Sequence, residues 1–397
     1  MVFAVAVLTM LLLGSVAMAA DGGHEKKWFT GNDEKAKKAI QNGCVVDKKD
    51  EDITSLRCGN ENVAKQAGLT PDVQTFALPV VKVSSENIRA ADIYADILLN
   101  ATPVWNIGVT GKGIPIAVLD TGVAEHPELK GRILKGRNFV DPKNPKNTFD
   151  GYGHGTWVTS IALGKGVNPY AKGISKGKVM PAKVLSDEGF GTFSDIPRAI
   201  NWSVRNGARI IIMSIGSSAV YSDDCGADFP ELTAAVANAR KKGVLVFSAA
   251  GNEGAAGTSA PGCVPGIITI GSIGWDYTHS WFSGEGSSVD LVGFGEGIIG
   301  AVPTGTCPMC DPTGYAAYYG TSGSTPEIAG FVALMLDANS RLSVEQIETN
   351  LYRAAVDLGP EGKDILYGWG LPDAYKAVQL SKKKNMHMMN DRSDMDR

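Results

Sequence analysis

From Gly108 to about residue 380, short apolar runs alternate with stretches whose apolar positions recur at helical spacing. Runs that are almost continuously apolar are typical of strands buried on both faces of a parallel sheet. Five such runs are expected as strands: 114–119, 179–185, 210–215, 244–249 and 267–270. Helices are expected over 156–163, 196–206 and 231–242. The alternation predicts a three-layer α/β fold, a mostly parallel twisted sheet with helices on both faces.

The C-terminal part of the chain is predicted to be helical and then disordered. Ser343 and Gln346 form a capping box for a helix through Ala354, and a last short helix is expected over 371–380. The polar residues 381–397 are expected to be a disordered tail.

Residues 20–95 are richer in charge and predict a small α+β unit. Short helices are expected over 34–40 and 61–67, a strand region over 73–83, and a helix or linker over 86–99.

Residues 1–19 resemble a secretory signal peptide. The apolar run from Val2 to Leu13 is short for a membrane span, and Ala17-Met18-Ala19 has the small-x-small cleavage pattern. We expect cleavage, a secreted extracellular protein, and no membrane attachment afterwards. The alternative is a retained membrane anchor.

Composition narrows the class of protein. The 397 residues are 44% hydrophobic and 20% charged, with a net charge of −4. These values are ordinary for a globular protein and give no basic surface for nucleic acid. We therefore expect no nucleic-acid partner, and we expect a monomer.

The chain has six cysteines, and an even number behind a signal peptide suggests disulfides. Proximity along the chain favours Cys44–Cys58 and Cys225–Cys263, which leaves Cys307 with Cys310. The Cys307-Pro-Met-Cys310 spacing could also be a redox motif or half a zinc site. No second such pair and no nearby His accompanies it.

Candidate chemistry begins at Gly320-Thr321-Ser322, a turn that we expect to lead into a helix with Pro326 in its first turn. A serine just before a helix lies near free N–H groups and the positive end of the helix dipole. Its hydroxyl could be a nucleophile whose oxyanion the main chain stabilises. The simpler alternative is a helix cap.

A nucleophilic serine needs a base, a group that orients the base, and donors for the oxyanion. His154 heads an apolar helical segment, Asp120 ends a buried strand, and Asn252 follows another strand. Each alone is more simply explained as a cap or turn residue. However, the order Asp, His, Ser along the chain is one of the orders found in serine triads.

Four motifs in this order resemble the subtilisin-like serine protease (subtilase) family, over about residues 100–380. The matching segments are Ala117-Val118-Leu119-Asp120-Thr121-Gly122-Val123, Gly153-His154-Gly155-Thr156, Ala249-Ala250-Gly251-Asn252 and Gly320-Thr321-Ser322. The spacing from Ser322 to Pro326 and to Ala329-Gly330 also fits the family.

The resemblance implies a serine endopeptidase that needs no cofactor for catalysis. Ser322 would be the nucleophile, His154 the general base and then acid, and Asp120 the group that orients His154. Asn252 and the Ser322 N–H would form the oxyanion hole.

The resemblance also implies how protein or peptide substrates bind. Two segments would grip extended peptide, Gly189-Phe190-Gly191 and Ser214-Ile215-Gly216. Ala249, Ala250 and Gly251, with Asn252, would line the S1 pocket, which holds the side chain before the cleaved bond. Residues 20–95 take the place of an inhibitory propeptide, so residues 96–380 would be the catalytic domain of a zymogen. The alternative for residues 20–95 is a permanent accessory domain.

Several residues depart from the family pattern. Gly323 stands where Met usually follows the nucleophile, and Glu327 stands where His is frequent. Glu128 replaces an Asp that often binds calcium in relatives, so Glu128 is a candidate ligand of a structural Ca²⁺.

Two other functional classes were weighed. An inactive binding homologue is disfavoured because all four catalytic positions are filled. An esterase or lipase of the α/β-hydrolase class needs G-x-S-x-G and the order Ser, Asp, His. Here Ser324 stands where that motif needs its second glycine, and the order along the chain is Asp, His, Ser.

Overall fold

The computed structural model describes residues 26–83 and 100–382. The expected signal peptide, the helix or linker over 86–99, and the tail from residue 383 lie outside the described residues. The chain divides into two compact units, Met1–Asp72 and Val73–Arg397. The strand region expected over 73–83 therefore belongs to the second unit.

The first unit is a four-stranded antiparallel sheet with two helices. The strand order is β2-β3-β1-β4. The strands are β1 (Lys27–Thr30), β2 (Val45–Lys49), β3 (Thr54–Arg57) and β4 (Thr70–Pro71). The helices are α2 (Asp33–Gln41) and α3 (Glu61–Ala67), which confirms both helices predicted here. Asn32 and Asn60 cap them, because each side chain accepts a first-turn N–H.

The second unit is built on a seven-stranded sheet in which all neighbouring strands are parallel. Its order is β17-β16-β14-β11-β7-β9-β8. The strands are β7 (Pro115–Asp120), β8 (Arg137–Asn138), β9 (Lys178–Lys183), β11 (Ile210–Met213), β14 (Leu245–Ala249), β16 (Ile268–Ile273) and β17 (Val289–Phe294). The five predicted strands are all present.

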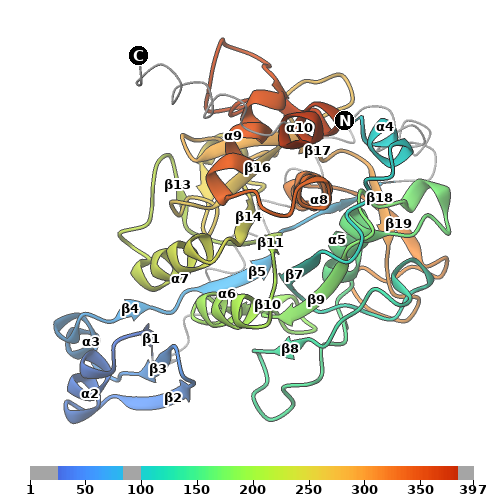
Figure 1. The fold of residues 1–397 in the computed structure, drawn as a ribbon. Coiled ribbons are helices and arrows are strands. Elements are labelled where there is room, and N and C mark those ends of the chain that lie inside the picture. The colour runs from blue at the N-terminus through green and yellow to red at the C-terminus, as the bar shows by residue number, and fades with distance from the viewer. Residues whose placement is uncertain (1–25, 84–99, 383–397) are drawn as a thin grey trace, which may run out of the picture. The chain divides into compact units, whose positions relative to one another are not determined.

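Helices cover both faces of this sheet, which confirms the predicted three-layer fold (Figure 1). One layer contains α5 (His154–Leu163) and α8 (Thr321–Ala338), which pack together. The other contains α6 (Asp195–Arg205) and α7 (Pro230–Lys241). The remaining helices are α4 (Ala101–Asn106), α9 (Val344–Ala354) and α10 (Ala374–Lys382). No helix of the described residues is both long and apolar enough to cross a bilayer.

Short strands and turns complete the unit. One small sheet has the order β10-β5-β12 and another β18-β19-β6. Their strands are β5 (Gln74–Ala77), β6 (Val81–Lys82), β10 (Phe190–Thr192), β12 (Ile215–Ser217), β18 (Ile298–Ala301) and β19 (Tyr315–Tyr319). Two-stranded pairs join β13 (Val220–Tyr221) to β15 (Thr258–Ser259) and β20 (Ala355–Val356) to β21 (Leu371–Pro372). The 3-10 turns are η3 (Pro127–Leu129), η4 (Pro169–Ala171) and η5 (Gly254–Ala256).

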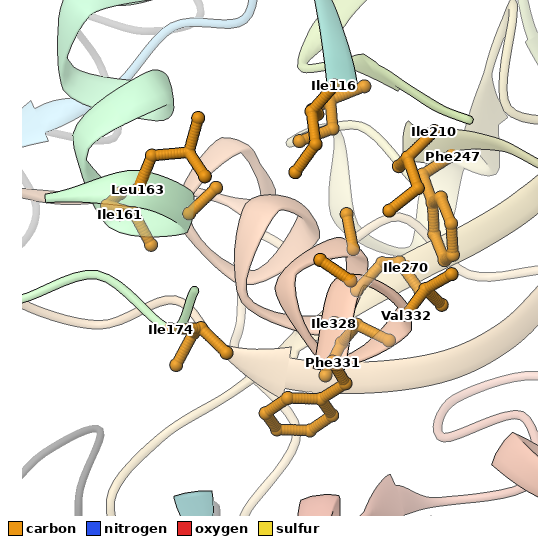
Figure 2. Close-up of a cluster of buried hydrophobic side chains, with 14 of the residues drawn as sticks. Ile116, Ile161, Leu163, Ile174, Ile210, Phe247, Ile270, Ile328, Phe331 and Val332 are labelled. Atoms are coloured by element: carbon orange, nitrogen blue, oxygen red, sulfur yellow. The ribbon is translucent and has the colours of Figure 1, made fainter. Parts of the chain in front are cut away.

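The core lies between α8 and the large sheet. Figure 2 shows Ile328 and Val332 of α8 next to Ile270 of β16, with Phe247 of β14 close by. Every residue from Thr321 to Leu336 is buried. Burying a side chain the size of Phe331 stabilises the fold by about 1.5–3 kcal/mol, so this layer holds the start of α8 firmly in place.

Three disulfides join Cys44 to Cys58, Cys225 to Cys263 and Cys307 to Cys310, as predicted from proximity. The Ser343–Gln346 capping box is also present. Three boundaries were predicted wrongly. The expected helix over 371–380 begins only at Ala374, because Leu371–Pro372 pairs with β20. It continues to Lys382, so Ser381 and Lys382 are helical and do not belong to the expected tail from residue 381. The expected strand over 210–215 breaks at Ser214, where the chain leaves the large sheet to form β12.

Candidate active site

Asp120 and His154 lie in direct contact. Asp120 is the last residue of β7, and His154 is the first residue of α5. His154 Nδ1 lies 2.8 Å from Asp120 Oδ1 and 3.0 Å from Oδ2, and both side chains are fully buried. The Thr121 N–H donates to Asp120 Oδ1 at 2.7 Å. The carboxylate therefore fixes the imidazole with its other nitrogen, Nε2, available.

A second buried carboxylate, Asp150, holds the turn that carries His154. Its Oδ1 accepts hydrogen bonds from the Gly153 N–H at 2.7 Å and from Thr121 Oγ1 at 2.8 Å. Its Oδ2 accepts from the N–H and the hydroxyl of Thr156 at 2.8 and 2.6 Å. The sequence analysis missed Asp150, although an acidic residue just before a predicted helix is a known signal for helix capping.

The N-terminus of α8 corrects the sequence prediction. The helix begins at Thr321, so Ser322 lies within its first turn and Pro326 lies inside the helix. Pro326 has no N–H to donate to the carbonyl four residues earlier, that of Ser322. The Ser214 hydroxyl donates to this carbonyl instead, at 3.1 Å.

The Ser322 hydroxyl donates to the Ser214 carbonyl at 3.3 Å. The buried Nε2 of His154 has no hydrogen-bond partner among the residues that the structure describes. The Ser322 hydroxyl and His154 Nε2 are therefore not hydrogen-bonded to each other.

Asn252 follows β14, and its side chain is held at both ends. Its Oδ1 accepts from the Thr321 N–H at 2.9 Å and from the Thr321 hydroxyl at 2.8 Å. Its Nδ2 donates to the Pro79 carbonyl at 2.7 Å. Thr321, which the sequence analysis did not single out, therefore directs the Asn252 N–H₂ group toward a bound carbonyl.

Residues 74–82, here called the inserted segment, lie against the two segments that the sequence analysis assigned to peptide binding. β5 pairs antiparallel with β10, near which it lies in Figure 1, and with β12 on its other side. Phe76 is opposite both Phe190 and Gly216, and the Ala77 N–H donates to the Gly189 carbonyl at 2.9 Å. Farther along, β6 pairs antiparallel with β19.

The side chain of Leu78 fills a confined space, here called the Leu78 site, and is only 1% exposed. A Cβ added at Gly216 would lie 2.5 Å from Leu78 Cδ2 and 2.7 Å from Ser259 Oγ. Ser259 is joined to Ala250 by an N–H to carbonyl bond of 2.8 Å. A side chain at residue 216 would therefore collide with Leu78 in its present position, and glycine leaves room for it.

Two glutamates have raised pKa values, the partly buried Glu253 and the fully buried Glu327. Glu253 directly follows Asn252, and burial raises its pKa to about 7. Glu327 of α8 is fully buried, and burial raises its pKa well above the usual range. Glu327 Oε2 accepts the Phe294 N–H at 3.1 Å, but Oε1 has no hydrogen-bond partner within residues 26–83 and 100–382.

Glu128, the candidate calcium ligand, is surrounded by donors. Its oxygens accept from the N–H groups of Gly166 and Asn168, both at 2.7 Å, and from the Tyr315 hydroxyl at 3.2 Å. The described residues contain no group of three or more His, Cys, Asp or Glu side chains suited to a metal ion. Calcium needs several oxygen ligands, so the contacts of Glu128 do not fit a Ca²⁺ site.

Comparisons with known proteins agree with this geometry. Residues 111–370 match the subtilase family (Peptidase S8). The chain is 30% identical over 397 residues to alkaline elastase YaB of Bacillus sp. (strain YaB), covering 94% of this chain and 96% of that protein. It is 36% identical over 288 residues to an intracellular serine protease of Paenibacillus polymyxa, covering 68% and 83% of the two chains.

A solved structure gives the same fold. The crystal structure of fervidolysin from Fervidobacterium pennivorans, a keratinolytic enzyme related to subtilisin, superimposes with a TM-score of 0.73 at 21% identity. The alignment covers 90% of this chain and 62% of that chain. Taken with the family match, these comparisons show that the chain belongs to the subtilase family and is a subtilisin-like serine endopeptidase.

Proposed function

We propose that the protein cleaves peptide bonds with Ser322 as nucleophile, His154 as base and Asp120 as the group that orients the base. One observation carries the proposal: extended main chain lies between β10 and β12 while one of its carbonyls accepts from Asn252 Nδ2. Asn252 Nδ2 is therefore placed to donate to a carbonyl of a peptide held between these strands, as an oxyanion-hole donor must. Here that carbonyl belongs to Pro79, one residue past Leu78.

In the proposed reaction the Ser322 hydroxyl turns from the Ser214 carbonyl toward His154 Nε2, which is free to accept its proton. Oγ then attacks the carbonyl carbon of the substrate, and negative charge forms on the carbonyl oxygen. Asn252 Nδ2 and the Ser322 N–H stabilise that oxyanion. Asp120, at 2.8 Å from Nδ1, stabilises the imidazolium that results.

The imidazolium next gives its proton to the leaving nitrogen, the C–N bond breaks, and an acyl-enzyme remains on Ser322. A water molecule gives a proton to His154 and attacks the ester, which releases the acid and restores the serine. Subtilases need no cofactor for this catalysis. We assign no step to calcium, because the donors around Glu128 occupy the carboxylate.

Substrate selection follows from the same contacts. Main-chain pairing with Gly189–Gly191 and with β12 depends little on side chains, so we expect many sequences to be accepted. The Leu78 site is proposed as the S1 pocket, with Ala249, Ala250 and Gly251 on its wall. Its occupant is apolar, which favours an apolar residue before the cleaved bond.

We further propose that residues 20–95 are a propeptide that inhibits the enzyme until it is removed. The inserted segment supports this, because it lies between β10 and β12, where a peptide substrate would bind. The protein would be secreted after cleavage near Ala19 and would act as a monomer, without a membrane or nucleic-acid partner.

The test is casein hydrolysis by the wild type and by Ser322→Ala. Ser324→Ala is the matched control, since Ser324 is a buried serine of the same helix turn whose hydroxyl donates to the Thr321 carbonyl. We expect Ser322→Ala to lose activity and Ser324→Ala to retain most of it. Equal activity of Ser322→Ala and wild type would reject Ser322 as the nucleophile.

A further inference from the structure

A loop closed by a disulfide lies beside the far end of the inserted segment. This loop, residues 303–314, contains the Cys307–Cys310 bond and precedes β19. The Met309 N–H donates to the Tyr152 carbonyl at 2.9 Å, and the Tyr318 hydroxyl donates to the Met309 carbonyl at 3.2 Å. The loop is therefore fixed both to β19 and to the turn that leads to His154.

Asp311 lies in this loop and is held in a defined orientation. Its N–H donates to the Pro303 carbonyl at 3.0 Å, and its Oδ1 accepts from the N–H and hydroxyl of Thr313 at 2.9 and 2.7 Å. The carboxylate side chain is 17% exposed. Oδ2 is thus directed outward from a rigid turn, and it can bind a cation without reordering the loop.

Lys82 of the inserted segment occupies that position. Its Nζ donates to Asp311 Oδ2 at 2.7 Å. The contact follows from the pairing of β6 with β19, which places Lys82 opposite Tyr318. The hydrogen bond from Lys82, with those from Thr313, lowers the pKa of Asp311 to about 2, so the carboxylate is charged at neutral pH.

We propose that Asp311 forms a binding subsite for a lysine or arginine side chain on the leaving-group side of the substrate. In the inserted segment Lys82 is the fourth residue after Leu78, whose side chain fills the proposed S1 pocket. The same backbone pairing with β19 would carry the side chain at this position of any extended substrate to Asp311. The inference rests on the proposed function, because it takes the inserted segment as a guide to the substrate path.

Partial exposure of the Lys82–Asp311 pair limits how strongly Asp311 can favour a lysine in the substrate. Lys82 is 53% exposed in this pair, so solvent and salt weaken the attraction. The short, charge-assisted hydrogen bond to an oriented carboxylate strengthens it. We expect the preference for lysine over glutamate to be about three- to tenfold in kcat/KM at low salt, and smaller at about 1 M salt.

The experiment uses active protease recovered after expression of the full chain. Internally quenched peptides carry the sequence of residues 74–83 with Pro79→Ala, and with Lys, Ala or Glu at position 82. Asp311→Asn and Asp311→Lys are compared with wild type. Asp276→Asn is the matched control, since Asp276 Oδ1 accepts the N–H and hydroxyl of Thr278 in the same kind of turn.

Wild type and Asp276→Asn should prefer the lysine peptide, Asp311→Asn should lose the preference, and Asp311→Lys should prefer the glutamate peptide. Casein hydrolysis by Asp276→Asn should match that by wild type. Hydrolysis of the three peptides at equal rates by wild type, or a lysine preference that persists in Asp311→Asn, would overturn the inference alone. If wild type hydrolyses neither casein nor any peptide, the proposed function fails, and the inference falls with it.

Discussion

Replacing Asn252 by alanine tests the proposed oxyanion hole. Asn252 supplies one side-chain donor, Nδ2, which binds the Pro79 carbonyl at 2.7 Å. Loss of one such donor lowers kcat by about 10²–10³, a value that comes from subtilisin, a relative of this protein. At about 1.36 kcal/mol per tenfold change, this is about 2.7–4 kcal/mol of transition-state stabilisation.

The substitution has a structural side effect that a second variant separates. Alanine also removes the acceptor of the Thr321 N–H, while the Thr321 hydroxyl keeps the Gly251 carbonyl as an acceptor at 3.1 Å. An unpaired buried donor costs about 1–3 kcal/mol of folding free energy. Asn252→Asp keeps an acceptor for Thr321 but removes the donor to the substrate. Both variants should therefore lose kcat, whereas Asn252→Asp should lose less folding stability.

The assay is steady-state hydrolysis of a chromogenic peptide with leucine before the cleaved bond, with active sites counted by burst titration. For Asn252→Ala we expect KM within about threefold of wild type, because the donor acts mainly on the charge that forms in the transition state. A large rise in KM with unchanged kcat would show that Asn252 contributes uniform binding, and the proposed role would be refuted.

Three further variants test other contacts. Pro79→Ala should accelerate removal of the N-terminal part. Asn252 meets the Pro79 carbonyl, one residue past Leu78, and the fixed backbone dihedral angle of proline limits how the chain can shift at this point. An unchanged rate of processing on gels would contradict this. Glu128→Ala should lower the free energy of unfolding by about 2–4 kcal/mol, because two N–H groups lose their acceptor. Urea denaturation should give the same difference with and without excess chelator, and a difference that chelator abolishes would indicate a bound metal. Glu327→Gln should remain stable at alkaline pH where wild type weakens, because a raised folded-state pKa means that stability declines as pH rises above about 4.5. Parallel melting temperatures for the two proteins from pH 5 to 9 would argue against this.

The large sheet was predictable because its signals are local. A strand buried on both faces needs a continuous apolar run, and the runs around Ile116, Ile211 and Val246 have no competing interpretation. Three of the candidate site residues lie at the ends of elements of this scaffold: Asp120 ends a strand, His154 begins a helix and Asn252 follows a strand. Their approximate location at one edge of the sheet therefore follows from the fold, while their distances do not.

Contacts between distant segments were not predictable. An apolar stretch around Phe76 indicates a strand, but nothing in it specifies β10 and β12 as partners. The boundary of α8 illustrates the same limit. Pro326 favours a first helical turn in isolation, yet the packing of α8 in the core starts the helix five residues earlier, at Thr321.

Glu128 shows how a substitution changes the meaning of a motif. The family resemblance suggested a calcium ligand, because an acidic residue occupies the matching position. In the structure the carboxylate ties together the loop of Gly166 and Asn168 by accepting two of its N–H groups. A sequence motif shows that a position is acidic, but it does not show whether hydrogen-bond donors or metal-binding oxygen atoms surround that residue.

The proline in α8 explains how Ser322, the proposed nucleophile, is joined to the segment that leads into β12. Because Pro326 cannot donate, the Ser322 carbonyl lacks its helical partner and accepts from the Ser214 hydroxyl, while the Ser322 hydroxyl donates back to the Ser214 carbonyl. Ser214 immediately precedes β12, which pairs with the inserted segment. A buried carbonyl without a donor is costly, so this exchange holds the end of β12 against the first turn of α8. One pair of hydrogen bonds thereby links Ser322, the proposed nucleophile, to the strand that pairs with the inserted segment.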